Sequence, residues 1–151
     1  MNNTPSHSAP VWFWIVAGTA LLWNLMGCVI FLSEVFALES NIETWTEPQK
    51  EWARSTPKWI YVLFAISVTS GVAGSIFLLL RQKLSTPLFS VSFAAVLVQM
   101  TYTMLIAGGL QVMGPSGAVM PTVVVVLGLT WLLFSLFSER KEWLDAKRAK
   151  P

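Results

Sequence analysis

The chain has 151 residues, of which 54% are hydrophobic and only 12% are charged, about half the charged share of an average soluble domain. The net charge of +2 is too small to favour a nucleic-acid-binding protein. Cys28 and His7 are the single cysteine and the single histidine, which excludes an intrachain disulfide and a metal or haem centre built on imidazoles. The composition indicates a membrane protein.

Four apolar runs are each about as long as the roughly 20 residues that a helix needs to cross a bilayer. We expect membrane spans at residues 11–38, 59–80, 88–109 and 121–137. The runs have no polar outer face, which a water-soluble four-helix core would need. The sequence therefore predicts an all-α fold, an integral membrane four-helix bundle in residues 11–138. An N-terminal tail of residues 1–10 precedes it, and a basic cytoplasmic tail of residues 139–151 follows.

The first span is expected to be retained, because no basic residue precedes it and its length exceeds that of a signal-peptide core. Small and polar residues with a phenylalanine towards each end recur along one face at intervals of three and four, namely Phe13, Ala17, Ala20, Asn24, Gly27, Phe31 and Glu34. Glu34 is the only acid within a span and lies near its outer end. We interpret Glu34 either as an interfacial anchor with Lys58 or Tyr61 as its partner, or as a gate or proton-coupled group.

The loop after the first span, residues 39–58, contains four acids and three basic residues. Thr46-Glu47-Pro48 predicts the start of a short surface helix, since a threonine N-cap and an early proline are typical of helix N-termini. Tryptophans recur at seven-residue intervals and favour the headgroup level of a bilayer. We expect one face of this loop to rest on the membrane through Trp45, Trp52 and Trp59.

The second and third spans are predicted to start at Thr56-Pro57 and Thr86-Pro87, each read as an N-cap followed by a proline in the first turn. Both spans contain small and polar residues that let helices approach closely and form hydrogen bonds. These residues are Ser67, Ser70, Gly71, Gly74 and Ser75 in the second span, and Ser92, Ala95, Gln99, Tyr102, Ile106 and Gly109 in the third. We expect the first three helices to face one another.

Three polar residues, Asn24, Ser67 and Gln99, fall near the bilayer midplane at a helical rise of about 1.5 Å per residue. An unpaired amide in hydrocarbon is costly, so Asn24 and Gln99 are expected to meet each other, a serine hydroxyl, a partner subunit or a ligand. The layer is either an interhelical clamp or a binding site for a neutral polar solute. Tyr102 joins Glu34 as a candidate outer gate or anchor.

The loop at residues 111–120 contains Gly114, Pro115 and Gly117, which is typical of a tight turn or a shallow re-entrant segment. The fourth span has few polar residues and is expected to face lipid or another subunit. Beyond it, residues 139–144 are expected to continue as a helix on the membrane surface.

The basic residues predict the orientation of the chain. Seven lysine and arginine residues lie in the second loop and the C-terminal tail, against three in the first loop. By the positive-inside rule this distribution places both termini in the cytoplasm.

Short motifs in all four spans carry a resemblance to a known group. They are Leu22-Trp23-Asn24-Leu25-Met26-Gly27, Thr56-Pro57-Lys58-Trp59, Leu97-Val98-Gln99-Met100, and the stretch from Met113-Gly114-Pro115 to Met120-Pro121. With them the chain resembles small four-helix bacterial inner-membrane proteins that are often labelled "sugar transporter". The resemblance implies a multi-pass location in the cell inner membrane and solute movement. Small multidrug exporters have as many spans but need a deep acid in the first helix, where this chain has Asn24.

Two classes of function remain. The sequence contains no paired intramembrane carboxylates, phosphate-binding glycine loop or nucleophile elbow, so we expect neither an enzyme nor a cofactor. The first class is an oligomeric transporter or permeability protein that binds a neutral polar solute at Asn24, Ser67 and Gln99. The alternative is a non-transport membrane subunit or a stabilising partner of another membrane component. The expected partners are the lipid bilayer and either further copies of the chain or another membrane protein.

Overall fold

The computed structural model describes residues 9–144. Most of the predicted N-terminal tail, including His7, lies outside the described residues. The same holds for residues 145–151 of the predicted basic tail, with Lys147, Arg148 and Lys150.

The described part of the chain consists of helices joined by short turns and contains no strand. Its elements are α1 (Val11–Phe36), α2 (Leu38–Asn41), α3 (Glu47–Arg54), α4 (Lys58–Leu79), α5 (Ser85–Thr101), the π-helix η1 (Tyr102–Ile106), α6 (Gly109–Gly117) and α7 (Val119–Arg140). Four helices among these residues are long and apolar enough to cross a membrane: α1, α4, α5 continued by η1, and α7. The prediction of an all-α chain with four such helices is confirmed.

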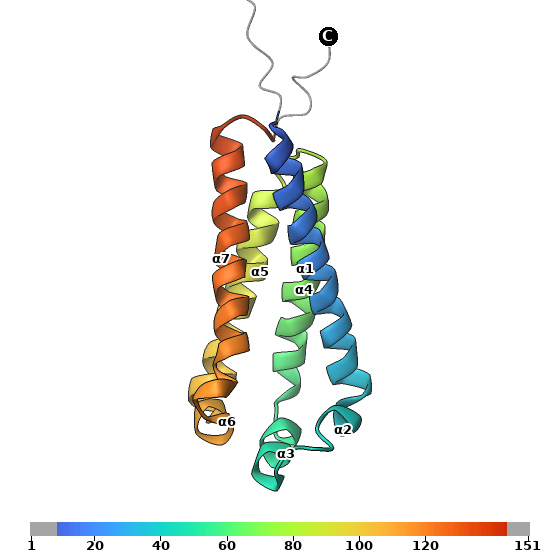
Figure 1. The fold of residues 1–151 in the computed structure, drawn as a ribbon, viewed down its shortest axis with the longest axis vertical. Coiled ribbons are helices and arrows are strands. Elements are labelled where there is room, and N and C mark those ends of the chain that lie inside the picture. The colour runs from blue at the N-terminus through green and yellow to red at the C-terminus, as the bar shows by residue number, and fades with distance from the viewer. Residues whose placement is uncertain (1–8, 145–151) are drawn as a thin grey trace, which may run out of the picture.

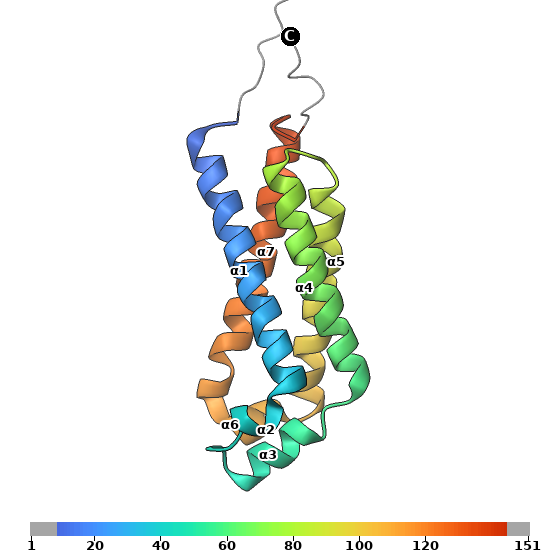
Figure 2. The same cartoon turned by 90° about the vertical axis from the view of Figure 1, so that its right-hand side faces the viewer.

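The four long helices run side by side (Figure 1). We call the end where α1 begins and α7 ends the terminal end, and the opposite end, with α2, α3 and α6, the loop end. Helix α1 packs on α4, α4 on α5, and α5 on α7, as the turned view also shows (Figure 2). Helix α4 therefore lies between α1 and α5.

Small residues allow this close packing of α4. The side chains of Ser67, Ser70 and Ser75 are buried, as are Gly71 and Gly74. A Cβ atom at Gly74 would lie only 3.3 Å from the ring of Phe89 on α5. The predicted small and polar face of the second span thus forms the contact surface for both neighbours.

Helix α7 packs on α5 through hydroxyl groups at the terminal end. The Oγ of Ser135 lies 3.0 Å from that of Ser85 and 2.9 Å from Oγ1 of Thr86, which donates to Glu139 Oε2 at 2.9 Å. Ser135 and Ser138 are fully buried. The fourth span was expected to face lipid or another subunit; α7 also packs on α5, because hydroxyls near its end pair across that interface.

Two predicted N-caps are also wrong, whereas a third is confirmed. Helix α4 begins at Lys58 with Pro57 as its N-cap, so Thr56 does not cap it. Helix α5 begins one residue before Thr86, whose hydroxyl bonds to α7 instead of its own backbone. Helix α3 begins as predicted, since Thr46 is its N-cap and donates its N–H to Gln49 Oε1 at 3.1 Å.

The loop predicted at residues 111–120 is mostly helical. It forms most of α6, which is interrupted at Gly114 by a φ of 70° and a ψ of −175°. Only glycine adopts this conformation readily, so Gly114 permits the kink before Pro115.

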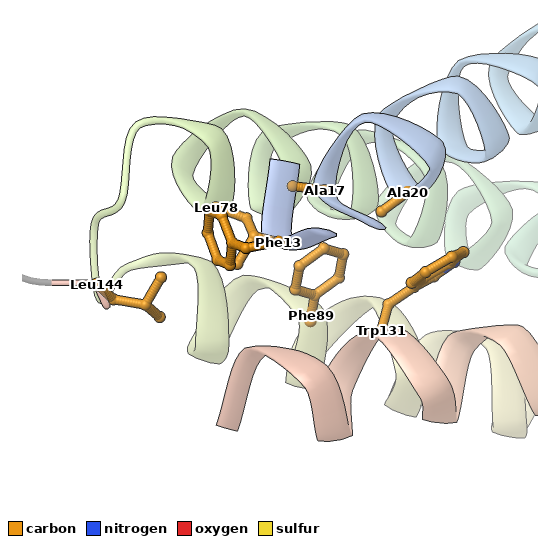
Figure 3. Packing of buried hydrophobic residues seen from close by; sticks show 7 residues of the cluster. All are labelled: Phe13, Ala17, Ala20, Leu78, Phe89, Trp131 and Leu144. Atoms are coloured by element: carbon orange, nitrogen blue, oxygen red, sulfur yellow. The ribbon is translucent and has the colours of Figure 1, made fainter. Parts of the chain in front are cut away.

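A hydrophobic cluster closes the terminal end. It consists of Phe13, Ala17, Ala20, Leu78, Phe89, Trp131 and Leu144, with Phe89 and Trp131 pointing from α5 and α7 towards α1 (Figure 3). After α7 the chain turns at Glu142, with a φ of 58°. The ring of Trp143 then packs at 5.9 Å from that of Phe13, and Arg81 Nε donates to the Trp143 carbonyl at 2.6 Å.

The turn at Glu142 corrects one further expectation. Residues 139–144 do not continue as a helix on the surface, because α7 ends at Arg140 and the chain folds back. The apolar side chains of Trp143 and Leu144 cover the bundle instead, and Leu144 is fully buried.

Candidate functional site

A cavity of about 600 Å³ lies between the long helices and extends to the loop end. Ligand-binding pockets commonly enclose roughly 300–1,000 Å³. Phe89 and Trp131, which belong to the terminal cluster, form its floor. All four long helices contribute to its walls, and α2, α3 and α6 line it at the loop end together with Trp45. A single chain therefore builds the whole cavity.

Asn24 lines the cavity from α1 and ties α1 to α4. Its Nδ2 donates to the carbonyl of Ala20 at 2.8 Å and to the Oγ of Ser75 at 3.2 Å. Gly71 makes room for this amide, because a Cβ atom there would overlap Oδ1 of Asn24. Both donor positions of the Asn24 amide are thus used within the protein.

Gln99 lines the same cavity from α5 but has a different environment. Its side chain is only 6% exposed, and its Oε1 has no hydrogen-bond partner among residues 9–144. The π-helix η1 begins three residues later and places Thr103 and Met104 in the same wall. Single π-helical turns often occur at functional sites. Gln99 therefore carries a buried acceptor without a partner in the wall of the cavity.

Ser67 completes the predicted midplane layer, since it lines the cavity with Asn24 and Gln99. Its Oγ donates to the carbonyl of Phe64 at 2.9 Å, and its own carbonyl accepts from the Oγ of Ser92 at 2.7 Å. The hydroxyl of Ser67 is thus satisfied on its own helix. The structure brings the three predicted residues to one cavity but joins none of them by a hydrogen bond.

Two tryptophans that the sequence did not suggest also belong to the site. Trp52 from α3 and Trp131 from α7 line the cavity, and each has a buried Nε1 without a partner in the described chain. Leaving a buried polar group unpaired costs about 1–3 kcal/mol. The sequence around Trp52 and Trp131 did not indicate that they line a cavity, because tryptophan in or near an apolar run is equally typical of a membrane interface.

The two candidate gate residues occupy different places. Glu34 lines the cavity near the loop end, where Tyr61 is close enough to interact electrostatically with its carboxylate. Tyr102 lies outside this cavity, with its ring packed at 4.7 Å against that of Trp59. The structure does not bring Glu34 and Tyr102 together in one gate.

No protein-family model, curated protein or solved structure matches this chain.

The lining of the cavity is similar in composition to that of small-molecule pockets. Its walls are mainly apolar and aromatic, and its unpaired buried groups are one acceptor, Gln99 Oε1, and two donors, the Nε1 atoms of Trp52 and Trp131. A few polar groups in an apolar cavity are typical of pockets that orient a small organic molecule. Within residues 9–144, no group of three or more histidine, cysteine or acidic side chains could hold a metal ion.

Proposed function

We propose that this chain is a small multi-pass protein of a bacterial inner membrane that binds an organic solute in its central cavity and moves it across the bilayer. Four helices of sufficient length and apolarity support the membrane location. The motifs around Asn24, Gln99 and Pro115 resemble those of the small four-helix inner-membrane proteins and support both the compartment and solute movement.

The distribution of basic residues supports an orientation with the terminal end in the cytoplasm. Arg81 and Lys83 follow α4, and Arg140 and Lys141 end α7. The loop end has Lys50, Arg54 and Lys58. Under the positive-inside rule, the floor of the cavity then faces the cytoplasm and its loop end faces outward.

The unpaired carbonyl of Gln99 is the observation that carries the proposal. In a folded chain a buried acceptor is normally paired, and Gln99 Oε1 has no partner although three serines and two asparagines line the same cavity. A solute with a hydrogen-bond donor would satisfy it, and an acceptor on the same solute would satisfy Trp131 Nε1. The groups near the floor are uncharged, so the part of the solute that reaches them is neutral and polar.

We propose that several copies act together in the membrane. Each chain builds its own cavity, but four helices do not supply the two repeated halves on which secondary transporters commonly rely for alternating access. The proposal includes no catalytic step and no cofactor.

Influx into vesicles that contain the purified protein tests this proposal. The probes are radiolabelled D-glucose, phenyl β-D-glucopyranoside and benzyltrimethylammonium, which cross protein-free bilayers slowly. We expect at least one probe to accumulate faster than in protein-free vesicles. Val124→Trp, which fills the cavity from α7, should abolish the gain, whereas Val126→Trp on the exposed face of α7 should retain it.

Two results would contradict the proposal. One is influx of all three probes at the protein-free rate, and the other is influx that Val124→Trp leaves unchanged. Absent influx together with stoichiometric co-purification of a different membrane protein would favour a non-transport subunit.

A further inference from the structure

Glu34 is the one charged residue that the described chain contributes to the wall of the cavity. It lies in the last turn of α1, at the loop end. Its carboxylate forms no ion pair within residues 9–144, and Lys58, the partner expected from the sequence, does not reach it. The wall therefore contains one acidic side chain and no lysine, arginine or histidine.

The two other basic residues at the loop end are occupied by other acids. Lys50 Nζ lies 3.0 Å from Glu47 Oε1, and Arg54 lies 2.6 Å from Glu39 Oε2. Both pairs are on or beside α3, and neither of these acids lines the cavity. The negative charge of Glu34 is thus left without a counter-charge from the protein in a mainly apolar wall, where a carboxylate is costly.

Aromatic side chains also line this cavity. Tyr61 and Phe64 line it from the first two turns of α4. Because α4 runs antiparallel to α1, these turns lie at the same end of the bundle as the last turns of α1 (Figure 2). Trp45 and Trp52 line it from the loop. Aromatic faces attract cations, and the attraction is strongest where water is excluded. A carboxylate among aromatic rings is a suitable receptor for an organic cation.

We infer that the solute carries one positive charge, as an organic ammonium group that lies beside Glu34 while its uncharged polar groups reach Gln99 and Trp131. This inference rests on the proposed function and refines its solute class. The residues near the floor select neutral hydrogen-bonding groups at one end of the solute. Glu34 and the aromatic residues select a cation at the other end.

Binding of a charged and an uncharged probe to the purified protein in maltoside detergent tests the inference. The probes are benzyltrimethylammonium and benzyl alcohol, and binding is followed by tryptophan fluorescence. We expect the cation to bind about tenfold more tightly. Glu34→Gln should remove this preference and leave the affinity for benzyl alcohol unchanged. Glu34→Asp should retain the preference, as should Glu51→Gln, which neutralises an exposed acid outside the cavity.

Equal affinities of the wild-type protein for the two probes would overturn the inference, and so would an unchanged preference in Glu34→Gln. If both probes bind equally and Val124→Trp blocks both, the cavity binds solutes but does not select charge. If neither binds, the proposed function fails together with the inference. If phosphatidylethanolamine displaces the bound cation, the ammonium group is that of a lipid. If the cation stays bound in the presence of this lipid, the ammonium group belongs to a soluble cation.

Discussion

Asn24 and Gln99 face one cavity from α1 and α5, yet no hydrogen bond joins their amides. Asn24 instead donates to Ser75 and holds α1 against α4, while the carbonyl of Gln99 remains unpaired. The two amides that look equivalent in the sequence therefore have different roles. Asn24 joins two helices, and Gln99 is the amide to which we assign the solute in the proposed function.

Leucine substitutions should separate these two roles. Asn24→Leu loses an interhelical hydrogen bond, and we expect a loss of roughly 0.6–1.7 kcal/mol in the free energy of unfolding. Gln99→Leu removes an unpaired buried acceptor, so its stability should equal or exceed that of the wild type while the affinity for benzyl alcohol, whose hydroxyl can donate to Gln99, falls. Thermal unfolding in detergent and the fluorescence assay measure the two effects. Loss of stability in Gln99→Leu with retained binding would show that Gln99 is structural.

Gly71→Ala should destabilise the contact between α1 and α4. The new Cβ atom would overlap Oδ1 of Asn24 and lie 3.2 Å from Oγ of Ser92, so the Asn24 amide has to move away from Ser75. Overpacking of this kind costs about 1–3 kcal/mol. Gly18→Ala is the matched control, since no atom lies within 4 Å of a Cβ there. Equal thermal midpoints for the two variants would contradict the close approach at Gly71.

The hydroxyl cluster between α5 and α7 should be sensitive to loss of one member. Ser135→Val leaves Ser85 and Thr86 without their shared partner in a buried site, and we expect a loss of about 1–3 kcal/mol in the free energy of unfolding. Thr130→Val alters an exposed hydroxyl that bonds only to its own helix, so its unfolding should match that of the wild type. A Ser135→Val protein as stable as Thr130→Val would show that α7 does not depend on these bonds.

The contact between α2 and α3 should weaken in acid. A hydrogen bond from Arg54, assisted by its charge, holds the pKa of Glu39 below its ordinary value of 4.5. A carboxyl whose pKa is lowered by folding adds stability above its unfolded pKa, and that stability is lost as the pH falls through its folded pKa. Both side chains are exposed, so the effect is local and small.

Amide hydrogen exchange in α3 measures this effect. We expect exchange, corrected for its intrinsic pH dependence, to become faster as the pH falls from above 4.5 to below it. In Glu39→Gln the protection of the α3 amides from exchange should no longer change between these pH values. The same pH dependence in wild type and Glu39→Gln would exclude the Glu39–Arg54 pair as its cause.

The sequence predicted the long helices and one buried face well, because both depend on simple spacing. The interval of three and four residues places Phe13, Ala17 and Ala20 on one face of α1, and all three are fully buried. In the same way, the small residues of the second span predicted that α4 packs closely on two other helices, which are α1 and α5. Runs of apolar residues and their helical period are thus sufficient to predict the four long helices and the close packing of α4, but not the packing of α7 on α5.

The site was only partly predictable. Asn24, Ser67 and Gln99 stand out because polar residues are rare in these runs, and all three line the cavity. Trp131 does not stand out, because an indole that faces lipid and one that faces a cavity have the same sequence context. Thr86 was misread as a cap because its partner, Ser135, is 49 residues further along the chain. Side-chain direction and distant pairing depend on tertiary packing.

The most direct test of a solute site in the cavity is fluorine NMR of the protein labelled with fluorotryptophan and titrated with benzyltrimethylammonium. Trp131→Phe and Trp52→Phe assign the resonances of the two cavity tryptophans whose Nε1 is unpaired, and Trp14, which does not line the cavity, is the reference. We predict that the resonances of Trp131 and Trp52 shift with saturation while that of Trp14 stays in place. Saturable binding that shifts the Trp14 resonance and leaves Trp131 and Trp52 unchanged would contradict the account.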